Sequence, residues 1–312
     1  MTTAAPHGIP GRPIHERQLD QAMVRLQRAA AASHQRGQLI EAIRVNAAVA
    51  LAVAGIVVTL AGHGRTAVSI IGAAWFVVSA FFLRRAATST TRQGALLQEM
   101  LDTELFYLPW RSTVAGDQVP EPDVAQLARR LRPGCKKDQR ILAGWYDPTD
   151  GVHHPYDVLI AQEQNLGWDA RLRRRYAALV LAAAVIWSGL GLIAGMLIAD
   201  ATIVNTLLSF FIPSLAIYQI ALEIWMGQQR VAAERQRLNR AVTLELRNAR
   251  PGPTSNSEWR HVREVARDVQ DGILRTRLDV SRVPEWFYRR YRNRDELDFA
   301  DTAEGHRKRL SS

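Results

Sequence analysis

A polar stripe inside an otherwise apolar segment holds the residues of this sequence that could form a functional pathway. Its members recur at intervals of three and four residues, with Ile212 and Ala216 between them, and they are Thr202, Asn205, Ser209, Gln219 and Glu223. This spacing places them on one face of a helix. A polar helix face in hydrocarbon is costly unless it meets water or another helix. The stripe could therefore line a narrow aqueous pore, or it could supply hydrogen bonds within a helical bundle.

Motifs of a catalytic centre do not stand out elsewhere in the chain. There is no phosphate-cradling glycine loop, no metal-ligand helix and no nucleophile elbow. The pair His153-His154 lies in a turn-rich region without carboxylates at ligand spacing, which favours a surface loop over a metal site. The single Cys135 allows no internal disulfide and suits a reducing cytosol. We expect no catalytic residue, no metal and no cofactor, and a membrane enzyme is the weakest interpretation.

Four long uncharged runs must position the stripe, and they are residues 45–61, 66–83, 177–199 and 201–222. The two later runs, of 23 and 22 residues, match the length of about 20 residues that a helix needs to cross the hydrocarbon core. The first two are shorter, and Asn46 dilutes the first, so a buried hairpin of a soluble bundle is the alternative there. The pattern predicts a mainly α integral membrane protein with transmembrane hairpins at 45–83 and 177–222.

The distribution of arginine predicts the orientation of these hairpins. Both connecting loops are minimal, residues 62–65 and Asp200, so each pair of helices must return straight across the membrane. Only Arg65 lies on the loop side, whereas the opposite side carries Arg36, Arg44, Arg84, Arg85, Arg92, Arg171, Arg173, Arg174, Arg175, Arg230, Arg235 and Arg237. Positive flanks mark the cytoplasmic side. We therefore expect both termini and the middle segment in the cytoplasm and the hairpins in the inner membrane.

The formal net charge of +10 needs no nucleic acid to explain it. Much of the charge sits in the juxtamembrane arginines, where topology and anionic headgroups account for it. A DNA or RNA polymer is therefore not expected as a partner, whereas the lipid bilayer is.

The polar segments predict a cytosolic tail and helix at 1–44, a middle domain at 84–176 and a helical C-terminal region at 223–312. Within the middle domain a helix is expected from Arg84 to Met100, and the sequence from Asp102 to Trp110 breaks its period. A second helix is expected from Tyr156 to Tyr176, running into the third span.

The C-terminal region is expected to continue the fourth span as a charged helix over 227–248. After a Pro-Gly-Pro breaker, a further helix is expected from Glu258 to about Leu274, with Ser257 as its N-cap. The last dozen residues are expected to be disordered.

Dispersed short motifs in the polar segments add a family resemblance. They follow one another through nearly the whole chain and are Arg17-Gln18, Gln98, Asp102, Leu108-Pro109-Trp110, Trp145-Tyr146, Gln162, Asn165, Trp168-Asp169, Leu172-Arg173-Arg174-Arg175-Tyr176, Gln270-Asp271, Arg275, Val283-Pro284 and Trp286-Phe287-Tyr288. With the two-hairpin layout, this order resembles the SMODS-associating four-transmembrane effector family. Ala161, Glu163 and Arg111 depart from the pattern.

The resemblance implies a bacterial antiphage effector, encoded beside a cyclic-oligonucleotide synthase. Such an effector senses the second messenger through its cytosolic parts and disrupts the inner membrane in abortive infection. It also favours a pore over bundle hydrogen bonds as the role of the stripe. One subunit with four helices has little room for a lumen, so a conducting form should be a homo-oligomer.

The messenger would be bound without hydrolysis. Its bases call for aromatic faces and its phosphates for arginines, and the candidate ligand-binding residues are Trp110, Trp145, Tyr146, Arg275, Trp286 and Tyr288. The alternative for each aromatic residue is a place in the core of a small domain. Lys136-Lys137 is interpreted as a solvated run.

The alternative from another class is a membrane-anchored sensor or scaffold without pore activity. Its helices would only hold the cytosolic domain against a partner. It predicts no conductance and tolerates exchange of the spans.

Overall fold

The computed structural model describes residues 12–61, 65–197, 210–250, 255–280 and 282–310, and these described parts form helices and connecting turns. The chain divides into two compact units. We call residues 1–35, 91–172 and 231–312 the polar unit, and residues 36–90 and 173–230 the apolar unit. Three polar segments far apart in the sequence therefore build one unit together.

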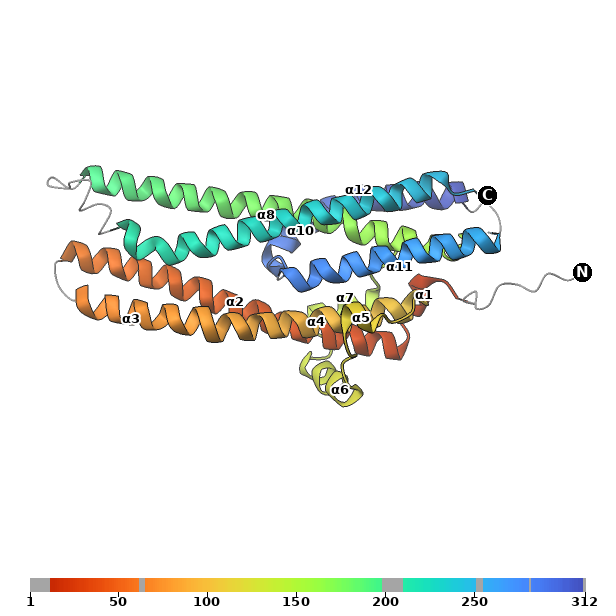
Figure 1. Ribbon diagram of the computed structural model, residues 1–312, viewed down its shortest axis with the longest axis horizontal. Coiled ribbons are helices and arrows are strands. Elements are labelled where there is room, and N and C mark those ends of the chain that lie inside the picture. The colour runs from red at the N-terminus through yellow and green to blue at the C-terminus, as the bar shows by residue number, and fades with distance from the viewer. Residues whose placement is uncertain (1–11, 62–64, 198–209, 251–254, 281, 311–312) are drawn as a thin grey trace, which may run out of the picture. The chain divides into compact units, whose positions relative to one another are not determined.

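The apolar unit consists of two helical hairpins (Figure 1). The first takes the later part of α2 (Gln21–Ala61), α3 (Arg65–Val77), a π-helical turn (Val78–Leu83) and the beginning of α4 (Arg84–Leu105). The second pairs the later part of α8 (Tyr156–Leu197) with the beginning of α10 (Ile212–Asn248). A hairpin buries its polar backbone groups within its helices, as hydrocarbon requires.

Length and hydropathy make three described helices able to cross a membrane. They cover Gln21–Val57, Ile70–Leu105 and Tyr156–Ile193. The expected fourth span, residues 201–222, lies partly outside the described residues. The prediction of a mainly α membrane protein is confirmed.

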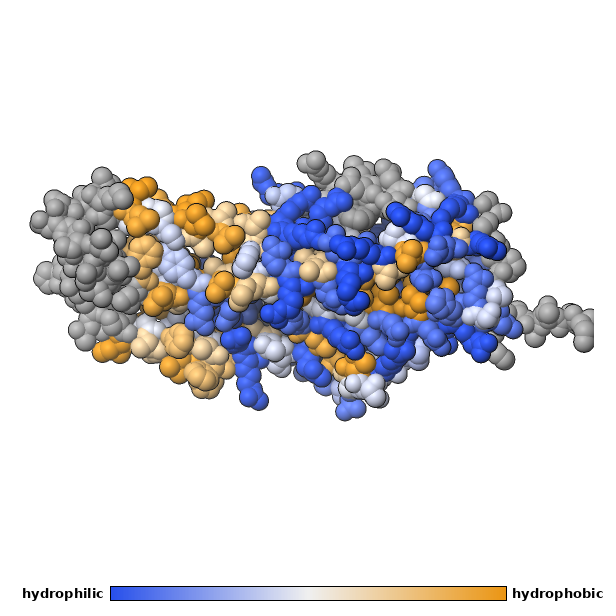
Figure 2. Space-filling model, turned by 45° about the horizontal axis from the view of Figure 1, so that its top comes forward, coloured by the Kyte–Doolittle hydropathy of each residue, from blue (hydrophilic) through white to orange (hydrophobic). Residues whose placement is uncertain are grey.

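Large apolar side chains cover the surface of the apolar unit. Phe81, Val185 and Ile186 are each more than 60% exposed, and Figure 2 shows apolar side chains gathered over the described helices of this unit. An apolar surface of this extent is unfavourable in water. It fits contact with lipid chains, which are as apolar as the side chains themselves.

The polar unit adds four short or medium helices to the remaining parts of α2, α4, α8 and α10. These are α1 (Ile14–Arg17), α5 (Ser112–Ala115), α6 (Glu121–Arg130) and α7 (Lys136–Ala143). Two longer helices, α11 (Asn256–Asp279) and α12 (Glu285–Leu310), complete it. Its apolar core includes Leu97, Leu105, Phe106, Leu159, Leu166, Leu246 and Ile273.

The end of α4 corrects one expectation about the middle segment. The helix continues to Leu105 instead of stopping near Met100, so Asp102 lies within its last turn. Helix α8 runs unbroken from Tyr156 to Leu197, as expected for a helix that enters the third span.

The C-terminal region corrects two further expectations. The side chain of Ser255, not that of Ser257, accepts a hydrogen bond from the Glu258 N–H and caps α11. The last dozen residues are not disordered as far as they are described, because α12 extends to Leu310. Leu310 is buried, and the Arg309 guanidinium donates to the carbonyl of Arg247 at 3.1 Å.

Candidate functional site

A buried carboxylate network joins α4 to α11 within the polar unit. Glu99 and Asp102 lie one turn apart on α4 and face α11. Arg267 donates to Glu99 at 2.7 Å, and the Gln270 amide donates to Glu99 at 2.8 Å and to Asp102 at 3.0 Å. Arg277 closes the network by donating to Asp102 at 2.7 Å. Buried charges need partners of this kind, and here each carboxylate has them.

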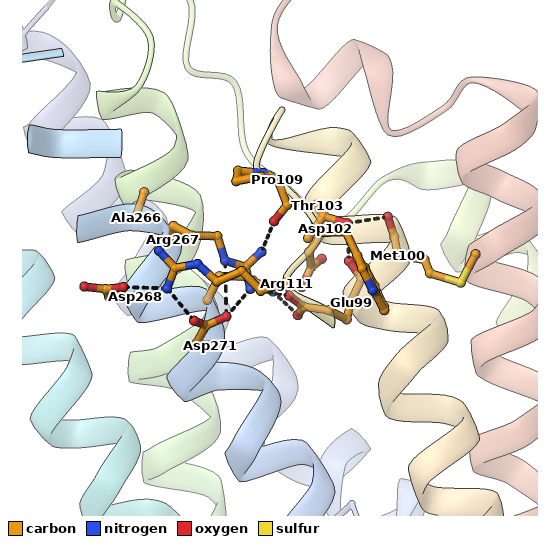
Figure 3. Close-up of polar contacts among 12 residues, drawn as sticks. Glu99, Met100, Asp102, Thr103, Pro109, Arg111, Ala266, Arg267, Asp268 and Asp271 are labelled. Carbon is orange, nitrogen blue, oxygen red and sulfur yellow. Dashed lines mark hydrogen bonds and ion pairs between the residues drawn. The ribbon is translucent and has the colours of Figure 1, made fainter. Parts of the chain in front are cut away.

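The network extends to the loop that follows α4 (Figure 3). Arg111 donates to Asp268 at 2.8 Å and to Asp271 at 2.7 Å. Arg267 also donates to the Pro109 carbonyl at 3.1 Å and contacts Asp271. Each of these donors has an acceptor, so the arrangement fixes the position of α11 against α4 and its loop. It presents no activated nucleophile.

The short motifs of the polar segments meet in this part of the unit. Gln18 accepts hydrogen bonds from the backbone N–H groups of Trp145 and Tyr146, at 2.7 and 3.0 Å. The Gln162 amide donates to Gln270 at 3.2 Å, and the Tyr146 hydroxyl lies 3.4 Å from Asp102. Residues separated by more than a hundred positions are thus parts of one structure.

A second cluster lies where α7 meets the start of α12, and we call it the α7–α12 junction. The Arg140 guanidinium pairs with Glu285 at 2.5 Å. Lys137 lies one turn before Arg140 on the same face of α7. Burial, with the nearby charges of Arg282 and Arg140, lowers the pKa of Lys137 to about 8, although Glu285 opposes the shift.

Three aromatic rings form a ladder beside this junction. Trp168 of α8 packs edge-on against Trp145, with ring centroids 5.9 Å apart, and against Tyr288 of α12 at 4.6 Å. Only 8% of Trp168 is exposed. Its indole N–H is buried without a hydrogen-bond partner among the described residues, which is uncommon for a buried tryptophan.

The expected pore stripe is only partly described. Thr202, Asn205 and Ser209 lie outside the described residues. Gln219 is exposed on the apolar unit, and Glu223 pairs with Arg84 at 3.2 Å. The hydrogen bonds from α10 to α8 come from other residues: Trp187 donates to Ser214 at 2.9 Å, and Ser188 lies 2.9 Å from the Tyr218 hydroxyl.

The similarity to known proteins extends over nearly the whole chain. The profile of the SMODS-associating 4TM effector domain matches residues 12–306. The chain belongs to this family. A protein of Bacillus cereus (strain VD146) named as a probable CBASS effector molecule is 21% identical over 281 residues, which cover 88% of this chain and 91% of that protein. No solved structure matches.

The structure of this SMODS-associating 4TM effector separates the six expected ligand residues into two groups. Trp110 and Tyr146 pack against the core of the polar unit. The Trp110 indole donates to the Gly116 carbonyl at 2.9 Å, and burial raises the pKa of Tyr146 well above its usual value, an effect that Asp102 strengthens. Their contacts are those of structural residues.

Of the other four expected residues, Trp145, Arg275 and Trp286 are exposed, and Tyr288 is partly buried. Trp145 and Tyr288 belong to the aromatic ladder, and Trp286 is 60% exposed near the start of α12. Arg275 is exposed on α11, and its charge helps to lower the pKa of Glu234 after the larger effect of Arg237. The ladder and the start of α12 thus contain three of the aromatic candidates, and they are Trp145, Trp286 and Tyr288.

Lys137 was not among the candidate ligand-binding residues. The expectation that Lys136 and Lys137 form a solvated run is wrong for Lys137. Lys136 is exposed, whereas Lys137 is half-buried. The helical spacing of Lys137 and Arg140 was a visible signal, but their partner on α12 was not. The expectation of a surface loop is also wrong for His154, which is buried and lies 3.0 Å from the Asp157 carboxylate.

Proposed function

We propose that this chain is a bacterial antiphage effector that a cyclic oligonucleotide activates to permeabilise the inner membrane. The polar unit would bind the messenger in the cytoplasm, and the hairpins would form the conducting part of a homo-oligomer. Membership of the effector family, over residues 12–306, supports the signalling role. The Bacillus cereus relative is named a probable CBASS effector molecule, which supports the same role.

The exposure of Gln219 on the apolar unit carries the pore proposal. Ser214 and Tyr218 supply hydrogen bonds to α8, so Gln219 is not needed for contact within that hairpin. Its side chain is exposed, and one amide N–H donates a long hydrogen bond of 3.4 Å to the Glu223 carboxylate. The amide oxygen and the other N–H need water or another chain, because lipid offers them no hydrogen bond. A pore within an oligomer supplies both.

Activation needs no chemistry on the messenger. A ligand that binds the conducting arrangement better than the resting one shifts the population toward it. The size of this shift is set by the difference between the two affinities. In such a mechanism the paired carboxylates of α4 would hold α4 and α11 in position. Both are engaged by arginine, so neither is available as a base for hydrolysis.

The test is leakage from dye-loaded liposomes that contain the purified protein, with a panel of cyclic di- and trinucleotides. We expect one member of the panel to cause rapid leakage. Asn205→Leu combined with Ser209→Leu should abolish leakage without loss of insertion or ligand binding, because it removes the polar face. Val185→Leu with Ile186→Leu, at exposed apolar positions of α8, is the matched control and should leak like the wild type.

Two results would contradict the proposal. Unchanged leakage of the Asn205/Ser209 double variant would remove the stripe from the pore. Binding of a cyclic nucleotide without leakage under any condition would favour the membrane-anchored sensor.

A further inference from the structure

Positive charge outweighs negative charge around Lys137 at the α7–α12 junction. Arg282 and Arg140 act on its ammonium as like charges, and Glu285 is the carboxylate that opposes them. Glu285 already pairs with Arg140 at 2.5 Å and with Arg289 at 3.5 Å. The cluster therefore attracts an anion.

The Lys137 ammonium makes no hydrogen bond or ion pair within the described parts of the chain. The neighbouring carboxylate of Asp138 does not serve it, because Asp138 is held by Arg28 at 2.7 Å and by the Gly134 N–H at 2.8 Å. The ammonium itself is not buried, so an anion from solution can reach it and accept a charge-assisted hydrogen bond.

Exposed apolar side chains follow these cations closely in the sequence. Leu142 is 51% exposed near the end of α7, Trp145 follows that helix, and Trp286 follows Glu285 directly in the chain. Aromatic faces beside cations are the arrangement that binds the bases and phosphates of nucleotides.

We propose that the α7–α12 junction is the phosphate subsite of the messenger, with Lys137 and Arg282 binding a phosphodiester and Trp145 or Trp286 stacking on a base. This inference rests on the proposed function and names its site. It places the ligand at the α7–α12 junction and not at the buried network of α4, where each carboxylate is already paired. It also gives Lys137 a role that Lys136 does not share.

A chemical probe can test the subsite before the messenger is known. Pyridoxal 5′-phosphate carries a phosphate and an aldehyde; the aldehyde condenses with a lysine amine to an imine and releases water, and borohydride reduces the imine to a stable secondary amine. The chain has three lysines, Lys136, Lys137 and Lys308, so two of them are internal controls. Peptide mapping gives the labelled fraction of each.

We expect Lys137 to be labelled first, with a rate that rises around pH 8. Lys136 and Lys308 are exposed and give the labelling of solvated lysines for comparison. Each member of the cyclic di- and trinucleotide panel is then tested for protection of Lys137, in detergent without added lipid. Protection by the member that causes leakage supports the subsite. Labelling of Lys137 no faster than of Lys136 would overturn it.

A second experiment compares the nucleotide affinities of the variants Lys137→Met and Lys136→Met. Loss of a charge-assisted hydrogen bond should weaken binding of the protecting nucleotide about ten- to a hundredfold for Lys137→Met, whereas Lys136→Met should bind like the wild type. Lys137→Arg should recover part of the affinity because it restores the charge. Unchanged thermal unfolding of Lys137→Met shows that the protein still folds.

The outcomes separate this inference from the proposed function. Leakage that a cyclic nucleotide triggers without protecting Lys137 overturns the subsite and leaves the function standing. Protection of Lys137 without leakage supports the subsite and contradicts the pore. Protection by vesicles containing cardiolipin but by no cyclic nucleotide would assign the cations to lipid headgroups and overturn the subsite.

Discussion

The Asp102 carboxylate is buried and has its charged partner on α11. Its side chain is 4% exposed and accepts from Arg277, whose side chain is 7% exposed, and from Gln270. Exposed pairs contribute little because water and salt screen them. A buried pair behaves differently, since removing one partner leaves the other charge without compensation.

Asp102→Asn should therefore destabilise the protein by about 3 kcal/mol, near the lower end of the range for a broken buried pair, because the charge of Glu99 still attracts Arg277. Glu234→Gln removes an ion pair to Arg237 at the surface and should change stability by less than about 1 kcal/mol. Thermal unfolding in detergent, followed by tryptophan fluorescence, compares the two. Equal decreases in the unfolding temperature of the two variants would mean that the buried pair stabilises the protein no more than the exposed pair does.

At the residue scale, the sequence did not show how the side chains of the motifs contact one another. Gln18, Asp102, Tyr146, Gln162 and Gln270 all belong to the motifs of the resemblance, yet only the fold shows that they bond to one another. A partner more than a hundred residues away leaves no periodic signal. Lys137 was misjudged for the same reason, because its surroundings come from α12.

At the scale of the elements, Gly191 of α8 packs against Phe210, which directly precedes Phe211 and the start of α10. A Cβ at Gly191 would lie 2.2 Å from the ring of Phe210, whereas a Cβ at Gly189 would meet nothing within 4 Å. Gly191→Ala should force the ring to move and destabilise the hairpin by about 1–3 kcal/mol. Gly189→Ala, two residues away, should cause no loss. The measurement is thermal unfolding in one detergent; a similar decrease for both variants would contradict close packing at Gly191.

Element bounds were predictable where apolar runs or breakers set them and not where tertiary contacts do. The uncharged run after Tyr176 predicted the long α8 correctly. Asp102 and the following Leu-Pro-Trp suggested an early end to α4, but Arg277 and Gln270 satisfy Asp102 within the helix. The charge of the C-terminal segment led us to expect disorder. Arg309 and Leu310 hold this segment in place, but their contacts lie far away in the sequence and leave no local signal.

For the whole molecule, the exposed face of α10 determines how copies could assemble. Leu215 and Leu222 are exposed on the same side as Gln219, at helical spacing. Lipid can cover the leucines but gives no hydrogen bond to the amide. A symmetric oligomer that turns this face toward its axis would satisfy the amide with water or with a neighbouring copy.

Cysteine cross-linking tests this assembly directly. Cys135 is the only cysteine, and its Sγ accepts from the Asp138 N–H at the start of α7, so Cys135→Ser keeps a capping group. In that background Gln219→Cys should form disulfide-linked dimers under mild oxidation in liposomes, and more of them with the activating nucleotide. Ile186→Cys, on the exposed face of α8, should stay monomeric because lipid surrounds it. Equal cross-linking of the two variants would indicate random collision, and cross-linking of Ile186→Cys alone would place α8 instead of α10 at the axis.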